Sequence, residues 1–205
     1  MHASRSVRRR RRAGRRVSRA VKRAVDVTAA MTLLAVTAPL LLAACAAIVL
    51  DSPGPPFYLQ WRMGRADRPF RIIKLRTMVV NAHRLGPALT EHRDPRITRV
   101  GRVLRRWSVD ELPQLVNVLA GHMSLVGPRP ELVSIVQAYT PQQREVFSVR
   151  PGLTGWAQIN GRDDLPIPVK LAFDREYVSR RSTLMDLSIM ARTAGVVVSG
   201  RGTKR

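Results

Sequence analysis

An adjacent pair of carboxylates, Asp110 and Glu111, is the feature of this sequence best suited to chemistry. Acidic residues are scarce, since the 205 residues include 14 Asp and Glu against 36 Lys and Arg. An acid pair in such a basic chain suggests a reaction on an anionic substrate. One carboxylate would attack or hold a metal ion, while cations would neutralise phosphate groups.

The same pair also has a structural interpretation. Asp110 is suited to cap a helix that begins just after it, and Pro113 would fall in the first turn, where a missing N–H costs little. The residues that this helix would bury are Leu112, Leu115, Val116 and Leu119. Both interpretations can hold together, because the dipole of a helix favours the ionised form of a carboxylate at its N-terminus.

An uncharged run of 24 residues, 27–50, precedes the acid pair. As a straight helix it would be about 36 Å long, enough to cross a hydrocarbon core of about 30 Å. Pro39 at its centre removes one backbone hydrogen bond and predicts a kink. Basic residues flank the run on both sides, which favours keeping both flanks in the cytoplasm. We therefore expect a bent, re-entrant membrane helix, and a transmembrane anchor with a proline kink is the alternative.

The N-terminal segment is strongly basic. Residues 1–23 contain eleven Lys and Arg and no acid, within a chain of net charge +22. Such a charge points to an anionic partner: nucleic acid, anionic lipid or a phosphorylated small molecule. The segment has too few apolar residues to fold alone, so we expect it to be disordered or to lie on anionic lipid headgroups. The single cysteine, Cys45, excludes an internal disulfide and a CxxC metal site.

The composition changes abruptly after Leu50, where a segment rich in proline ends the apolar run. Short apolar patterns at 57–59 and 70–75 predict a small pair of strands. Residues 99–107 have helical periodicity, with an apolar stripe between arginines that suits either a membrane interface or a soluble core. The predicted class is α+β: a mainly helical monotopic membrane protein with one re-entrant kinked helix, interfacial amphipathic helices and a small β element. Its parts are a basic tail at 1–23, a membrane helix at 24–50 and a catalytic domain at 51–205.

Several motifs in one order give the chain a resemblance to a known family. They are KRAVD, the apolar run with its central proline, FRIIKLRTM, DPRITRVGRVLRRWSVDELPQLVNVL, MSLVGPRPE, RPGLTGWAQINGR and FDREYV. In this order they resemble the bacterial sugar transferases, the monotopic phosphoglycosyl transferases that act on polyprenyl phosphate. The resemblance covers about residues 22–200. The chain departs from it at Ala38, where many relatives carry serine before the proline and where Thr37 is the nearest substitute. It departs again at Leu75 and at 163–166.

The resemblance implies an activity, its partners and a cofactor. Such enzymes transfer a sugar 1-phosphate from a nucleotide diphosphate sugar, here expected to be a UDP-sugar, to polyprenyl phosphate at the cytoplasmic face of the cell membrane. This step initiates exopolysaccharide or other glycoconjugate synthesis. By resemblance, Asp110 is the nucleophile that forms a phosphosugar intermediate, and Glu111 together with Asp110 binds Mg²⁺. Anionic lipids are expected partners, and nucleic acid is not.

Further substrate contacts are expected from charged and amide side chains in the same motifs. Arg129, fixed between two prolines, suits a bidentate phosphate contact. Asp174 suits either substrate binding or structural support. Any single arginine could instead be a solvated surface charge. The amide side chains of Gln114 and Asn117 could instead form the polar surface of a helix. The full set of expected contacts is Lys74, Arg76, Arg96, Gln114, Asn117, Arg129, Arg162 and Asp174.

Two functions without catalysis remain as alternatives. The arginine-rich tail could bind nucleic-acid backbones without sequence specificity. The chain could also be a membrane-anchored scaffold that recruits partners through basic loops. The scaffold would leave Asp110 replaceable, whereas the enzyme would lose its activity with that side chain. Deletion of residues 1–21 should abolish nucleic-acid binding and spare the enzyme.

Overall fold

The structure is a computed structural model that describes residues 2–87, 89–91, 93–161 and 164–199, with side chains from Ala20 onward. In its described part the chain is mainly helical with two small sheets, which confirms the α+β class in its coarser form. The first elements are α1 (His2–Asp51), β1 (Phe57–Met63), η1 (Arg65–Asp67), β2 (Pro69–Leu75), η2 (Ala82–Arg84), α2 (Arg99–Arg106), η3 (Val109–Glu111) and α3 (Gln114–Leu119). The later ones are β3 (Ser124–Val126), α4 (Val133–Val136), η4 (Gln143–Ser148), β4 (Gly152–Thr154), α5 (Trp156–Ile159), α6 (Ile167–Arg180) and α7 (Thr183–Ser199).

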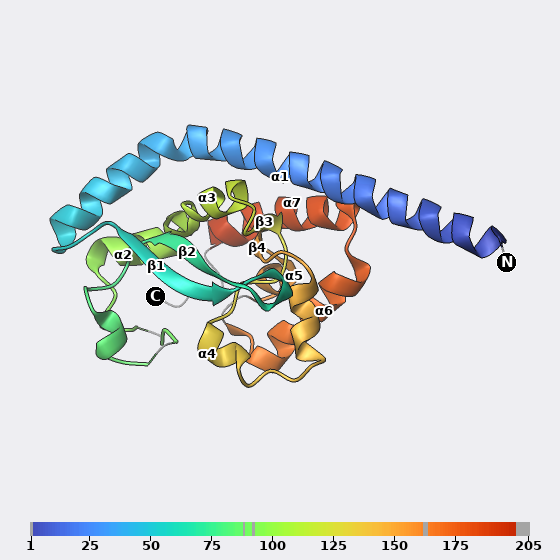
Figure 1. Cartoon of the computed structure of the whole chain (residues 1–205). Coiled ribbons are helices and arrows are strands. Elements are labelled where there is room, and N and C mark those ends of the chain that lie inside the picture. The colour runs from blue at the N-terminus through green and yellow to red at the C-terminus, as the bar shows by residue number, and fades with distance from the viewer. Residues whose placement is uncertain (1, 88, 92, 162–163, 200–205) are drawn as a thin grey trace.

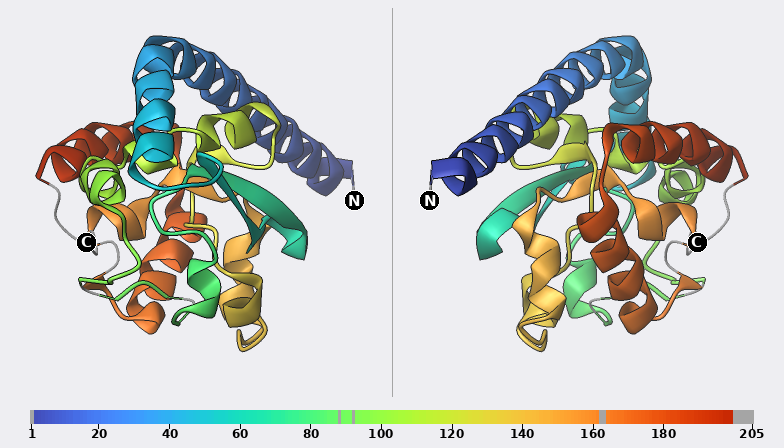
Figure 2. Two further views of the ribbon diagram at one scale, coloured as in Figure 1. Left: turned by 90° about the vertical axis from the view of Figure 1, so that its left-hand side faces the viewer. Right: turned by 90° about the vertical axis from the view of Figure 1, so that its right-hand side faces the viewer.

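Helix α1 runs without interruption through both the basic tail and the apolar run. The structure therefore has no break near residue 24, and the tail is helical rather than disordered, while its position on anionic lipid stays a prediction. Two causes act together: Arg and Ala are strong helix formers, and the tail only has to extend a helix that the apolar run has already started. The helix lies across the rest of the molecule, and its cyan end turns back toward the other elements (Figure 1; Figure 2).

The bend in α1 accompanies Pro39, the proline inside this helix. Thr37 Oγ1 donates a hydrogen bond to a backbone carbonyl, as the sequence suggests, at 2.7 Å. That carbonyl belongs to Leu33, whereas the one that Pro39 deprives of its donor belongs to Ala35. Threonine bonds of this kind often bend helices.

The part of α1 from Ala20 to Asp51 is long and apolar enough to cross a membrane, and only 11% of its most apolar window is buried. Its buried residues nevertheless contact the rest of the molecule on both sides of the bend. Ala30 belongs to the central core. Ala44 and Ile48 pack with Leu75 of β2 and Leu104 of α2. Leu34 and Leu41 are partly buried against the same clusters. Most of the other large apolar side chains are exposed: Met31, Leu33, Val36, Leu40, Leu42, Val49 and Leu50.

Strands β1 and β2 form an antiparallel hairpin in which Phe57 pairs with Leu75 and Met63 with Pro69. This confirms the predicted strand pair and extends its first strand by four residues. The N-terminus of helix α2 is capped by Thr98, whose side chain accepts a hydrogen bond from the backbone N–H of Gly101 at 3.0 Å. The predicted helix over 99–107 is thereby confirmed to within one residue.

The segment after α2 differs from the expected helix cap. Ser108 takes a left-handed conformation with φ 55°, and the next three residues form the single turn η3. The N-cap of α3 is Pro113, and no side chain caps this helix, so the prediction that Asp110 is its N-cap is wrong. Val116 is exposed rather than buried, because α3 is short and turns this residue away from the core.

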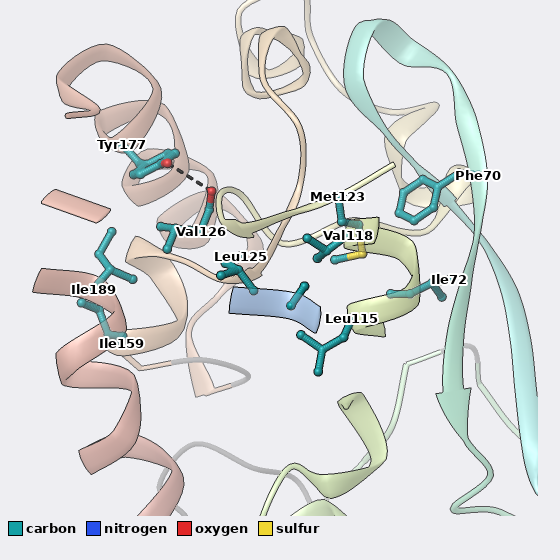
Figure 3. Close-up of a cluster of buried hydrophobic side chains, with 11 residues drawn as sticks. Phe70, Ile72, Leu115, Val118, Met123, Leu125, Val126, Ile159, Tyr177 and Ile189 are labelled. Atoms are coloured by element: carbon teal, nitrogen blue, oxygen red, sulfur yellow. Dashed lines mark hydrogen bonds between the residues drawn. The ribbon is translucent and has the colours of Figure 1, made fainter. Parts of the chain in front are cut away.

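The core joins α1, α3, α6 and α7 around the short parallel pair of β3 and β4. Figure 3 shows Leu115 and Val118 of α3 on one side of this core and Ile189 of α7 on the other. Tyr177 of α6 lies on the same side as Ile189 and donates a hydrogen bond to the carbonyl of Val126, at 3.2 Å. Strand β3 is therefore fixed from several sides, and the segment that follows it carries Arg129.

Candidate active site

Asp110 and Glu111 lie in η3, the turn between α2 and α3. Only 8% of Asp110 and 9% of Glu111 are exposed. Two neighbouring carboxylates in so buried a position are costly unless cations or hydrogen-bond donors compensate them.

Two cations compensate Glu111. Lys74 of β2 donates from Nζ to Glu111 Oε1 at 3.0 Å. Arg129 donates from Nη2 to the same oxygen at 2.7 Å and from Nη1 to Oε2 at 3.4 Å. Both cations are among the side chains expected at the site, so the structure brings together four predicted residues from three separate segments.

Burial raises the pKa of Asp110, and the negative charge of Glu111 raises it further. The positive charges of Lys74, Arg105 and Arg129 oppose this rise. Burial also lowers the pKa of Lys74, while Glu111 acts in the other direction. The site is thus an electrostatically coupled group in which each charge depends on its neighbours.

A second set of charges borders Arg129. Arg62 of β1 donates from Nη1 to the carbonyl of Pro130 at 3.2 Å. Burial and the nearby Arg129 lower the pKa of Arg62, whereas Glu131 and Glu111 raise it. The sequence reasoning missed both Arg62 and Glu131. Signals were present, because Arg62 is the one charged residue in the strand FYLQWRM and Glu131 ends the motif GPRPE.

Asp174 of α6 lies beside this second set. Burial raises its pKa to about 8, Glu131 adds to the rise, and Arg129 opposes it. Its Oδ1 has no hydrogen-bond partner, and neither has the hydroxyl of Tyr139, which is also buried. Burial, followed by the charges of Glu131 and Asp174, raises the pKa of Tyr139. Unpaired buried polar atoms of this kind are a common property of binding sites that lack their ligand.

Arg76, expected at the phosphates, lies elsewhere. Its guanidinium donates to the carbonyls of residues 52–55 and to the Ser52 hydroxyl, at 2.7–3.1 Å. All five of its N–H groups are used by the loop that ends α1. Arg76 therefore fastens this loop in the structure, and its contact with substrate stays a prediction.

Arg96 and Asn117 are also engaged in structural contacts. Arg96 forms a two-point ion pair with Asp94, at 2.8 and 2.6 Å, and donates to the carbonyls of Ala82 and Pro87. The side-chain amide of Asn117 accepts from a backbone N–H of β2 and donates to a backbone carbonyl of the same strand, as the backbone of a neighbouring strand would. Both side chains therefore have a structural role in the fold, and their contact with substrate stays a prediction.

Two further predicted residues complete the set. Gln114 is buried three residues after Glu111, and its Nε2 lacks a partner, so it stays a candidate for contact with a ligand at the acids. Arg162 lies outside the described residues.

The acid pair fits a magnesium ion in its donor chemistry. Mg²⁺ prefers oxygen ligands and is often held by one or two carboxylates together with substrate phosphates. Asp110 and Glu111 offer such oxygens, and the mutual repulsion that raises the pKa of Asp110 is what a divalent cation would relieve. Among the described residues, no three His, Cys, Asp or Glu side chains gather as a complete protein ligand set. Substrate phosphates and water would supply the other ligands of such an ion.

Comparison with known proteins gives a consistent result. The sequence profile described as bacterial sugar transferase matches residues 17–200. The UDP-glucose:undecaprenyl-phosphate glucose-1-phosphate transferase of Caulobacter vibrioides is 46% identical over 177 residues, which are 82% of this chain and 66% of the relative. The uncharacterized sugar transferase EpsL of Bacillus subtilis is 41% identical over 180 residues, 88% of each chain. The UDP-N-acetylgalactosamine-undecaprenyl-phosphate N-acetylgalactosaminephosphotransferase of Aeromonas hydrophila is 38% identical over 189 residues, 88% of this chain but only 44% of the relative.

Proposed function

The chain belongs to the bacterial sugar transferase family, and from this premise we propose that it transfers a sugar 1-phosphate from a UDP-sugar to polyprenyl phosphate. The names of two relatives support both the nucleotide and the lipid acceptor. The product would be the first lipid-linked intermediate of an exopolysaccharide or another glycoconjugate. The family also argues against the two functions without catalysis.

The first step is attack by the Asp110 carboxylate on the phosphorus that carries the sugar. A new P–O bond joins the sugar phosphate to Asp110, and the bond between the two phosphates breaks, so that UMP leaves with the bonding electrons. Arg129 and Lys74, which bind Glu111 at 2.7 and 3.0 Å, supply positive charge where the phosphates would lie. Such charges reduce the repulsion between a carboxylate and a pyrophosphate.

In the second step a phosphate oxygen of the polyprenyl phosphate attacks the same phosphorus. The bond to Asp110 breaks, which restores the carboxylate and leaves the sugar joined to the lipid through a pyrophosphate. Asp174, with its unpaired Oδ1, and the Tyr139 hydroxyl could accept and donate hydrogen bonds to the uncharged part of the donor.

Mg²⁺ would be held by Glu111 and Asp110. When bound, it would neutralise phosphate charge and make the leaving group better. The ion pairs of Glu111 with Lys74 and Arg129 orient this carboxylate.

The arrangement of α1 supports a re-entrant membrane helix at the cytoplasmic face. Arg23, before the bend, bonds α3, and Ile48, after the bend, packs with α2. Both halves of the helix are thus attached to one catalytic domain, while most of the large apolar side chains between them are exposed. A helix with both ends on the same domain suits entry and exit through one membrane face.

The observation that carries the proposal is the buried acid pair, in which Glu111 contacts two cations that come from separate segments. Its test is UMP release from UDP-sugars by the purified protein in detergent with polyprenyl phosphate and Mg²⁺. We expect Asp110→Asn to abolish release, and the matched control Glu145→Gln, at an exposed acid, to keep it. Full activity of Asp110→Asn, or no release from any UDP-sugar by the unmodified protein, would contradict the proposal.

A further inference from the structure

The polar end of the membrane segment of α1 is attached to both chain segments that carry the acid pair and its arginine. Lys22, Arg23 and Asp26 lie within two turns of this helix. Each makes hydrogen bonds to residues at least 95 positions away in the sequence. Contacts of such long range set how the helix sits on the catalytic domain.

Lys22 connects α1 to the segment that leads to Arg129. Its Nζ donates to Asp186 Oδ2 of α7 at 2.6 Å and to the carbonyl of Val126 at 3.4 Å. The other oxygen of Asp186 accepts a hydrogen bond from the Tyr177 hydroxyl at 2.7 Å, and the same hydroxyl bonds the Val126 carbonyl. Val126 is the last residue of β3 and lies three positions before Arg129. The network therefore fixes the start of the arginine segment relative to the membrane helix.

Arg23 connects α1 to the segment that follows the acid pair. Its Nη1 donates to the carbonyl of Val118 at 2.6 Å, and its Nη2 donates to the carbonyl of Leu119 at 3.0 Å. These carbonyls lie at the end of α3, where backbone donors of the helix run out, although that of Val118 also accepts from the backbone N–H of Gly121. Because α3 begins three residues after Glu111, a charged donor at its end also fixes the helix that continues from the acids.

Asp26 adds a third attachment. It is buried, and its carboxylate accepts hydrogen bonds from the Ser124 hydroxyl at 2.8 Å and from the backbone N–H of Leu125 at 3.2 Å. A buried carboxylate with two donors from one strand holds that strand in register. Strand β3 is thus bound to α1 by Asp26 at its start and by Lys22 at its end.

From these contacts we infer that Lys22 and Arg23 are positioning residues, which set the acid pair and Arg129 at a fixed place relative to the membrane helix. The inference rests on the proposed function. Arg129 and Glu111 also bind one another directly, so the two segments stay together without α1. The attachments to α1 instead determine where these two joined segments lie relative to the bilayer. The reaction with the soluble UDP-sugar does not depend on that placement, whereas the reaction with a polyprenyl phosphate held in the bilayer does.

The experiment separates the two half-reactions. The first is measured as UMP release, or as exchange of labelled UMP into the UDP-sugar, without acceptor. The second is measured as transfer to polyprenyl phosphate in vesicles. For Lys22→Met and for Asp186→Asn, which keeps an acceptor for the Tyr177 hydroxyl, we expect the first half-reaction to stay within about twofold. Transfer in vesicles should fall about tenfold, as expected for a modest displacement of reacting groups.

Three comparisons make the result specific. A short-chain prenyl phosphate dissolved in detergent should be used by the variants almost as well as by the unmodified protein, because its phosphate is not held at a bilayer. Lys22→Arg should restore transfer in vesicles. Arg180→Met, which removes an exposed ion pair with Glu176, is the matched control and should change neither half-reaction.

A parallel fall of both half-reactions in the variants, or unchanged transfer in vesicles, would overturn the inference and leave the proposed function intact. Absence of UMP release by the unmodified protein would overturn the proposed function, and the inference with it. If both half-reactions fall because a variant unfolds, its melting temperature in detergent will fall as well.

Discussion

The guanidinium of Arg129 lies against the carboxylate of Glu111 in a two-point contact, with Nη2 2.7 Å from Oε1 and Nη1 3.4 Å from Oε2. The contact joins the segment after β3 to the turn before α3. A planar guanidinium suits this geometry, and a carboxylate and a phosphate can be bound by the same donors. Arg129 can therefore hold Glu111 in the free protein and also present charge to an arriving phosphate.

The first prediction concerns Arg129→Lys. Lysine keeps the charge but cannot form the two-point contact, so we expect kcat/KM for the UDP-sugar to fall about 10- to 100-fold, the equivalent of one or two charged hydrogen bonds. The melting temperature should change little, because Lys74 still compensates Glu111. Arg68→Lys, at an exposed loop position, is the control and should keep full activity. Unchanged kcat/KM in Arg129→Lys would show that the geometry of the guanidinium is not needed.

The second prediction concerns Arg76→Met. Because this side chain bonds the loop over residues 52–55, its loss should lower the free energy of unfolding by about 2–4 kcal/mol. The KM for the UDP-sugar should stay unchanged in the molecules that remain folded. Thermal unfolding in detergent and steady-state kinetics below the melting temperature measure the two effects. A raised KM with unchanged stability would return Arg76 to the substrate-binding residues.

The third prediction concerns Asn117→Ala. The Asn117 side chain accepts from the backbone N–H of Ile73 at 3.0 Å and donates to the carbonyl of Arg71 at 2.8 Å. Alanine would leave both backbone groups without these partners, and we expect a loss of about 2–5 kcal/mol in stability. Asn117→Asp keeps the acceptor and loses the donor, so its melting temperature should lie between those of the alanine variant and the unmodified protein. Equal melting temperatures for all three proteins would exclude the bridging role.

Local sequence patterns predicted those parts of the fold that local forces determine. The hairpin of β1 and β2 and the helix α2 have clear periodicity, and both form where expected. The parallel pair of β3 and β4 was not predicted, because each strand has only three residues and its partner lies far away in the sequence. The helical tail was missed for a different reason: its composition suggested a segment unable to fold alone, whereas it continues a helix already formed by the apolar run.

Residue type alone could not separate site arginines from structural ones. The order of motifs correctly placed Lys74 and Arg129 with the acid pair. Arg76 and Arg96 come from equally suggestive motifs, but their donors meet loop carbonyls or Asp94. Which carbonyls surround a guanidinium depends on the path of distant loops, and the sequence gives no direct sign of that path.

The fourth prediction concerns the pH dependence caused by Asp174. Its pKa in the folded protein is raised to about 8, above the usual value of about 4 for the unfolded chain. Between these values the folded protein holds one more proton than the unfolded chain, so stability falls as pH rises, by at most about 1.4 kcal/mol per pH unit. An asparagine side chain does not titrate in this range, so Asp174→Asn should remove this part of the fall in stability. Melting temperatures at pH 5 and pH 8 measure it, and identical pH dependence in both proteins would contradict the raised pKa.

The last prediction concerns the membrane contact of α2. Val103 and Trp107 are exposed apolar side chains on the helix that precedes the acid pair, and the arginines around them suit lipid headgroups. If this surface lies in the membrane interface, Val103→Asp replaces a buried contact with a charge. We expect binding to anionic vesicles to weaken about tenfold or more, since burying one valine side chain contributes about 1.5 kcal/mol or more. UMP release in detergent should not change, because Val103 does not contact the acid pair in the structure. Val169→Asp, at an exposed position on α6, is the matched control. Equal vesicle binding by the two variants would show that α2 does not enter the interface, and α1 would then supply the apolar contact with the bilayer.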